Sequence, residues 1–164
     1  MKISNKILWK VPLFCIIAGV IAFYTVVYLI GPFMLVTLPD GTITSDDTRT
    51  FIGYGAIFIV SLFVGGMFVF REMTRKEIFF SASIVVVIGL LLNLLQWTFS
   101  LTTGIGAIFF MYASRIFEWS SIITLLLFRV SDNIWFIVFI SSLTPYLFIL
   151  FGKKGIVNSD SQSS

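Results

Sequence analysis

Long apolar runs alternate with short polar breaks along this chain. A helix needs about 20 mostly apolar residues to cross a lipid bilayer. Three runs meet this requirement without a charged residue, at residues 11–35, 51–70 and 78–99, and a shorter uncharged run covers residues 134–151 up to Gly152. The pattern therefore predicts an all-α fold, a polytopic transmembrane helical bundle.

A further run, residues 105–128, is mostly apolar but carries Arg115 and Glu118 near its centre. As a straight helix its 24 residues would reach about 36 Å, so its length favours a bundle of five helices. The alternative is four spans plus one interfacial or re-entrant helix, because each charge at the bilayer centre costs roughly 2.5–3.5 kcal/mol. Their i, i+3 spacing lets the two side chains pair and recover part of this cost. We expect five helices, and the alternative stays open.

Local signals mark where several elements begin. Pro39-Asp40-Gly41 is a strong turn signal, so the segment around it predicts a short hairpin over the membrane surface. Ser45 or Asp46 is placed to cap the second helix. Thr74 and Glu77 form the T-x-x-E capping box that opens the third helix.

The last apolar run has its own boundary signals. Asn133 or Asp132 is placed to cap its first turn. Pro145 removes a backbone donor inside the run, and Ser141, Ser142 and Thr144 supply hydroxyls that can bond to the freed carbonyl. This predicts a kinked or broken last helix.

The distribution of Lys and Arg predicts the orientation. Three of these residues precede the first helix and three lie in residues 71–77, whereas residues 36–50 carry one. Cytoplasmic loops carry an excess of Lys and Arg, so we expect a cell-membrane protein with a cytoplasmic N-terminus. The total count does not separate the two topologies, because five spans put seven of the eleven cations in the cytoplasm and four spans put eight there.

The composition agrees with lipid as the main solvent of this chain. Hydrophobic residues make up 58 % and charged residues 12 %, against about 25 % charged residues in soluble domains. The net charge of +3 is too small and too dispersed to form a nucleic-acid-binding face. We expect one transmembrane domain over residues 1–152 and a polar, disordered tail over residues 153–164.

Few residues are suited to catalysis or metal binding. The chain has no histidine, and Cys15 is its one cysteine, so the usual general base and cysteine-based metal clusters are missing. No P-loop, dinucleotide-binding or zinc-protease motif is present. We therefore expect no enzyme, no cofactor and no metal, but a non-enzymatic accessory, partner-binding or protective membrane protein.

Four polar residues within the predicted spans form a candidate intramembrane site: Arg115, Glu118, Asn93 and Gln96. On a helical wheel Glu118 shares a side with Ser114, Ser121 and Thr124, with Arg115 at its edge and Trp119 opposite. The charged pair is interpreted as a proton or substrate contact, as a structural salt bridge, or as a headgroup contact. Asn93 and Gln96, on one face with Gly89 and Ser100, either meet this pair or hold helices together. The alternative function is a small transporter or channel component built around Arg115 and Glu118.

The second predicted helix carries a stripe of small residues. Gly53, Ser61 and Gly65 lie along it, and Ser61-x-x-x-Gly65 is a spacing that lets two helix backbones approach closely. Besides the bilayer, the predicted partners are therefore a second copy of the chain or another membrane protein that packs on this helix.

Overall fold

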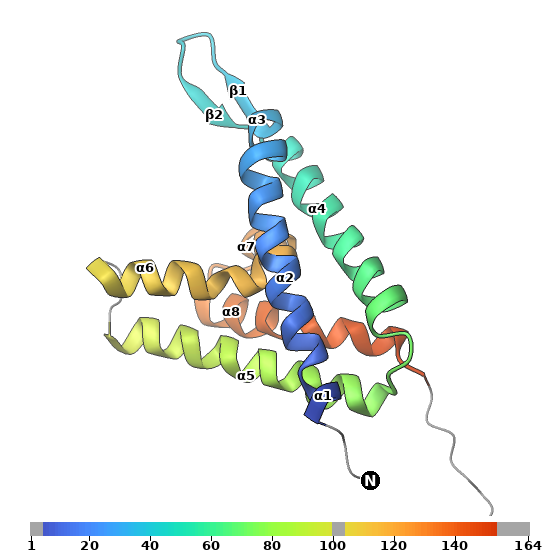
Figure 1. Cartoon of the computed structure of the whole chain (residues 1–164). Coiled ribbons are helices and arrows are strands. Elements are labelled where there is room, and N and C mark those ends of the chain that lie inside the picture. Colours follow the sequence, from blue (N-terminus) through green and yellow to red (C-terminus); the bar gives the residue numbers. More distant parts are fainter. Residues whose placement is uncertain (1–4, 100–103, 154–164) are drawn as a thin grey trace, which may run out of the picture.

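The computed structural model describes residues 5–99 and 104–153, which fold into helices with a single short hairpin (Figure 1). Four helices within these ranges are long and apolar enough to cross a membrane: Lys10–Met34, Asp47–Val69, Arg75–Phe99 and Ile134–Phe151. They agree with the four uncharged predicted spans, so the all-α class is confirmed. Apart from Lys153, the predicted polar tail lies outside the described residues.

The first long helix passes a proline without ending. Its parts, after the short α1 (Asn5–Leu8), are α2 (Lys10–Thr25), η1 (Val26–Ile30) and α3 (Gly31–Met34). Pro32 has no N–H to donate to the helical ladder. The preceding turn, η1, is a wider π turn in which the Gly31 N–H bonds to the Val26 carbonyl.

The predicted hairpin is present. It consists of β1 (Leu35–Thr37) and β2 (Ile43–Ser45), paired antiparallel. At its tip the Asp40 carboxylate accepts hydrogen bonds from the Thr42 N–H and hydroxyl, at 2.9 and 2.7 Å. Gly41 has a φ of 82°, which favours glycine. The hairpin projects beyond the helices that it joins (Figure 1).

The second and third long helices begin with the predicted caps. α4 (Asp47–Val64), continued by η2 (Gly65–Val69), is capped by Asp46, whose carboxylate accepts from the Arg49 N–H at 2.8 Å. α5 (Arg75–Phe99) opens with the capping box. There the Glu77 carboxylate accepts from the Thr74 N–H at 2.8 Å and the Glu77 N–H donates to the Thr74 hydroxyl at 3.3 Å.

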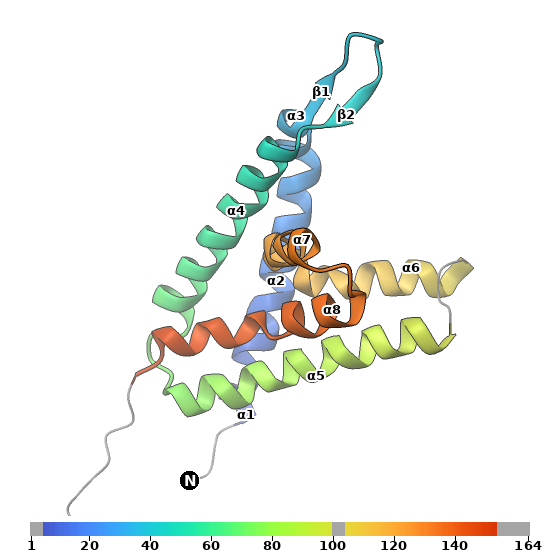
Figure 2. The same cartoon turned by 180° about the vertical axis from the view of Figure 1, so that it is seen from behind.

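The predicted fifth long helix is not confirmed, because residues 105–128 are divided between three elements. They are α6 (Gly104–Ala113), the 3₁₀ helix η3 (Ser114–Ser120) and α7 (Ser121–Val130). A 3₁₀ helix has about 3.0 residues per turn, and the chain changes direction through η3 (Figures 1 and 2). Trp119, which the wheel placed opposite the polar side, is fully buried.

The last helix is broken at its proline. α8 (Ile134–Ser142) is capped by the Asn133 amide oxygen, which accepts from the Trp135 and Phe136 N–H groups, and η4 (Thr144–Phe151) follows as a 3₁₀ helix with Pro145 in its first turn. Two backbone bonds then tie the end of η4 to the start of α5. The Lys153 N–H donates to the Met73 carbonyl at 3.0 Å, and the Arg75 N–H donates to the Lys153 carbonyl at 3.2 Å.

The helices form two groups that cross each other. α5, α6 and α8 with η4 run alongside one another and are called the lower layer. α2 and α4 are called the upright pair: α2 crosses the lower layer, and α4 reaches its edge where η4 ends and α5 begins (Figures 1 and 2). At the crossing lies an aromatic cluster of Phe14, Phe70, Trp119 and Phe148. Ring centroids are 4.8 Å apart for Phe70–Phe148 and 5.2 Å apart for Trp119–Phe148.

Candidate functional site

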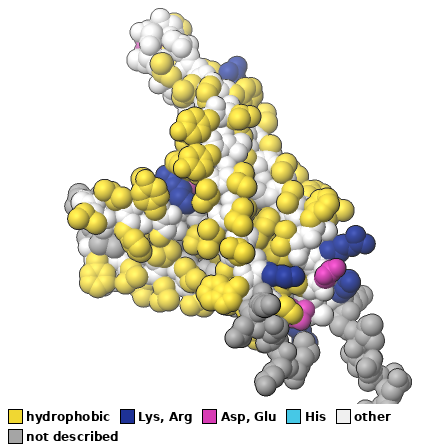
Figure 3. Space-filling model, in the orientation of Figure 1, with side chains coloured by type: hydrophobic (Ala, Val, Ile, Leu, Met, Phe, Trp, Pro, Cys, Tyr) yellow, Lys and Arg dark blue, Asp and Glu magenta, His cyan; other side chains and the backbone are white. Residues whose placement is uncertain are grey.

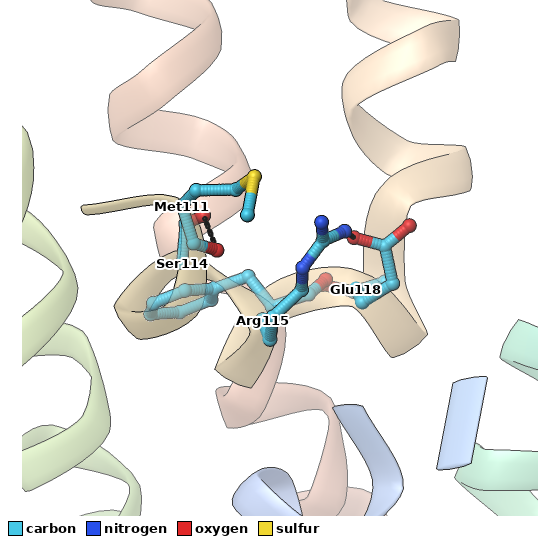
Figure 4. Close-up of polar contacts among 6 residues, drawn as sticks. Met111, Ser114, Arg115 and Glu118 are labelled. Carbon is cyan, nitrogen blue, oxygen red and sulfur yellow. Dashed lines mark hydrogen bonds and ion pairs between the residues drawn. The ribbon is translucent and has the colours of Figure 1, made fainter. Parts of the chain in front are cut away.

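The charged pair of the candidate site is formed. Arg115 Nη1 lies 3.3 Å from Glu118 Oε2, and the two side chains are 22 % and 18 % exposed. Figure 4 shows them pointing toward one another along η3, whereas the Ser114 hydroxyl bonds back to the Met111 carbonyl. The Arg115 guanidinium also lies over the Phe23 ring of α2, with its central carbon 3.6 Å from the ring centroid. The carboxylate and the ring therefore both stabilise this one cation.

A glycine in α2 allows η3 to come close enough for this contact. A Cβ atom on Gly19 would overlap the carbonyl oxygen of Arg115 and lie 3.1 Å from the Ile116 Cα. Gly19 precedes Phe23 by one helical turn, so both face η3. The pair thus lies on η3 against α2, where the lower layer meets the upright pair, and its most direct effect is to join η3 to α2.

Asn93 and Gln96 lie in a different site, a cavity of about 200 Å³ in the lower layer. The cavity is bounded by α5, α6, η3, α7 and α8. Its lining residues are Leu92, Asn93, Gln96, Phe110, Ser114, Phe117, Ser120, Thr124, Val138, Ser141 and Ser142. Seven of these eleven side chains carry an amide or a hydroxyl and none is ionisable, so polar groups interrupt a lining that is otherwise apolar and formally uncharged. We call it the polar cavity.

Several polar groups of this cavity donate their hydrogens to their own helices. The hydroxyls of Ser114, Ser120 and Ser142 donate to the carbonyls of Met111, Phe117 and Val138, at 3.0, 2.9 and 2.7 Å. The Asn93 amide donates to the Gly89 carbonyl at 2.8 Å. A hydroxyl that donates keeps two lone pairs as acceptors. These serine oxygens keep their acceptor capacity, and the Asn93 and Gln96 amides carry donors as well as acceptors, so the cavity offers both kinds of hydrogen-bonding group.

The structure thus divides the four predicted residues into two sites. Arg115 and Glu118 pair against α2, and Asn93 and Gln96 line the polar cavity, which Arg115 and Glu118 do not line. The wheel placed Ser114 and Glu118 on one side because it assumed 3.6 residues per turn through η3. Ser100, which the wheel grouped with Asn93, lies outside the described residues.

Five of the seven polar lining residues were not among the four proposed site residues: Ser114, Ser120, Thr124, Ser141 and Ser142. The sequence places Ser141 and Ser142 at the break beside Pro145, a minor candidate site because a broken helix can host one. At this break the Ser141 carbonyl accepts from the Thr144 hydroxyl at 2.6 Å. Their position beside a broken helix was the available signal, because broken membrane helices often border binding sites.

The small residues of α4 and η2 are used inside the chain. A Cβ on Gly53 would meet Ile30 and Met34, and one on Gly65 would meet Phe148. Ser61 lines an apolar groove of about 380 Å³ between α2 and α4. Gly53 and Gly65 therefore pack against η1, α3 and η4 within the chain, and a partner on this helix stays a prediction.

Most of the surface is apolar, and its charges are concentrated. Figure 3 shows hydrophobic side chains over both helix groups and a cluster of basic and acidic side chains where α2 and α5 begin and η2 ends. Across residues 5–99 and 104–153, no three Cys, Asp or Glu side chains lie close enough together to hold a metal ion.

No known protein family, curated protein or solved structure matches this chain. The class that its own residues define is an all-α protein whose long apolar helices are compatible with a membrane.

Proposed function

We propose that this chain is a multi-pass protein of the cell membrane that crosses the bilayer four times and acts by binding rather than by catalysis. The observation that carries the topology is the backbone pairing of Lys153 with Met73 and Arg75. These bonds hold the end of the last helix beside residues 71–77. The start of the first helix lies at the same end of the molecule, because the Val11 N–H, next to Lys10, donates to the Ser81 hydroxyl of α5. Both chain ends then face the cytoplasm.

This topology agrees with the charges. It puts eight of the eleven cations on the cytoplasmic side and leaves the hairpin outside. Residues 104–130 then enter and leave from the outer side as a re-entrant segment. Irregular backbone such as η3 is tolerated at membrane depth where protein buries it, and Trp119 and Ser120 of η3 are buried.

The topology is tested by labelling single cysteines in intact cells with a membrane-impermeant thiol reagent. In a Cys15→Ser background, Gly41→Cys at the hairpin tip is expected to react from outside, and Lys153→Cys only after the cells are opened. Labelling of both positions in intact cells would refute four spans and support five.

Binding without catalysis is favoured by the state of the charged residues. Glu118 is paired with Arg115, whereas acid–base catalysis needs a group free to exchange a proton. The preferred role is an accessory or partner-binding subunit of a membrane complex. It predicts that the chain, purified in a mild detergent, migrates with a stable partner or as a defined oligomer, and a lone monomer would count against this role.

A small transporter or channel component is the second candidate, and the polar cavity is the observation that favours it. A re-entrant segment and a broken helix meet there, as they do around binding sites in transporters. This candidate predicts that Ser120→Cys and Ser142→Cys react with a small water-soluble thiol reagent, whereas Ile57→Cys, in the apolar groove, does not. Unreactive thiols at both serine positions would refute a water-accessible site.

A further inference from the structure

We propose that the end of the molecule where α5 begins binds the headgroup of an anionic phospholipid. The site is a group of five exposed cations that we call the basic junction: Lys10, Arg71, Arg75, Lys76 and Lys153. This inference rests on the proposal that the chain crosses a bilayer. It goes beyond that proposal because it assigns a ligand of stated chemistry to this end of the chain.

The fold brings these cations together from three separate parts of the sequence. Two backbone hydrogen bonds hold Lys153 beside residues 73–75. The ring of Phe14, one helical turn beyond Lys10, lies 5.3 Å from the ring of Phe70 at the end of η2. Figure 3 shows the charged side chains gathered at this end. Clusters of Lys and Arg at the cytoplasmic ends of membrane helices are typical of sites for anionic lipids.

The positive charge of the basic junction is not balanced by neighbouring carboxylates. Glu72 and Glu77 lie among its cations in the sequence, and the Glu77 carboxylate accepts hydrogen bonds from the N–H and hydroxyl of Thr74. Within residues 5–99 and 104–153, none of the five cations forms an ion pair with a carboxylate. Five positive charges against two negative charges leave a local excess, and a bound phosphate would reduce the repulsion within it.

The surface around these charges combines phosphate-binding groups with apolar side chains. The Arg75 Nε–H donates to the Gly152 carbonyl at 3.3 Å, which fixes the guanidinium at the end of η4. The planar fork of a guanidinium matches a phosphate group. On the apolar side, Trp9 directly precedes Lys10 and is exposed, and Phe68 of η2 is 80 % exposed. A phospholipid presents a phosphate and acyl chains together, so it fits this surface better than a soluble phosphate or an acidic protein does.

The test measures the thermal unfolding midpoint (Tm) of the full chain in lipid nanodiscs. The bilayer is phosphatidylcholine, which has no net charge, with an increasing share of anionic phosphatidylglycerol that carries the same acyl chains. We expect phosphatidylglycerol to raise the Tm saturably by about 3–5 °C. Concentrated salt should reduce this rise, because salt screens exposed charges. Both leaflets of a nanodisc have the same composition, so the result does not depend on which end faces the cytoplasm.

Variants assign the effect to the basic junction. Arg71→Gln/Lys76→Gln removes two of its cations and should abolish at least half of the rise. Arg49→Gln/Arg129→Gln is the matched control, because it removes two exposed cations from the opposite end, where α4 begins, and it should leave the rise unchanged. Lys153→Gln should also reduce the rise, and it carries the test if the double variant does not fold, because the backbone bonds of residue 153 remain.

Three results would overturn the proposal. One is an equal Tm with and without phosphatidylglycerol, or a rise that both junction variants retain. Another is a rise that the control variant loses to the same extent, because the lipid would then respond to net charge and not to this site. The third is an equal rise when inorganic phosphate is added to phosphatidylcholine nanodiscs, which would identify a phosphate site in place of a lipid site. The cysteine labelling described above tests the topology independently, so a failure of that proposal is distinguishable from absent lipid binding.

Discussion

Gly19 is the residue at which a single methyl group should disturb the fold most selectively. Replacing it with alanine places a Cβ 2.9 Å from the Arg115 carbonyl carbon and 3.1 Å from the Ile116 Cα, and closer still to the Arg115 carbonyl oxygen. All three atoms belong to backbone, so no side chain can rotate away. α2 and η3 have to separate, which withdraws Phe23 from the Arg115 guanidinium.

The cost follows from two opposing terms. Alanine gains about 1 kcal/mol over glycine inside a helix, and overpacking a closely packed contact costs typically 1–3 kcal/mol and occasionally more. The clash is with backbone, so we take the upper part of that range and expect Gly19→Ala to lower the free energy of unfolding by about 2 kcal/mol. For a chain of this length, this corresponds to a Tm lower by roughly 4–8 °C.

Gly55→Ala is the matched control, because nothing lies within 4 Å of a Cβ built there in α4. Thermal unfolding in nanodiscs should show this variant equal to or slightly more stable than the natural chain. A Gly19→Ala protein as stable as Gly55→Ala would refute the close contact between α2 and η3.

Other contacts give equally definite expectations. Glu118→Gln leaves Arg115 without its carboxylate and should lower the free energy of unfolding by about 3 kcal/mol. The double variant Arg115→Met/Glu118→Leu should regain most of this loss. A Glu118→Gln protein with the same free energy of unfolding as the natural chain would contradict the expectation. Asp46→Ala should cost about 1 kcal/mol through the lost cap, whereas Asp46→Asn should cost little. The hydrogen bonds from Thr42 hold the pKa of Asp40 below its ordinary value of 3.8. These bonds therefore stabilise the hairpin tip above pH 3.8, and this stabilisation is lost as the pH falls through the lowered pKa of Asp40. An NMR titration in which the Thr42 amide signal shifts with a midpoint at or above pH 3.8 would contradict this prediction.

Signals that act within a few residues were readable from the sequence. Asp46, the Thr74–Glu77 box and Asn133 act through hydrogen bonds to N–H groups no more than three residues away. The hairpin depended on the turn at Pro39-Asp40-Gly41. The uncharged spans were equally legible, because hydrophobicity over about 20 residues depends on no partner.

The division of residues 105–128 was not readable in this way. Ser114–Ser120 packs against Gly19, about 95 positions earlier in the chain, and buries Trp119, and neither contact leaves a signal in the local sequence. A wheel extended through that turn accumulates an angular error at every residue. Glu118 and Ser114 therefore separate onto two sites although their i, i+4 spacing suggests a shared face.

The aromatic cluster has a consequence for the order in which the chain is made. Phe14 and Phe70 are complete in the nascent chain well before Phe148, which contacts both and is fully buried. Synthesis at about 5–20 residues per second takes roughly 4–16 s to add the 148 − 70 = 78 residues between the last two. In a membrane, lipid acyl chains would fill the position of Phe148 during that time. Insertion of the last helix must then displace lipid before the lower layer can close on the upright pair.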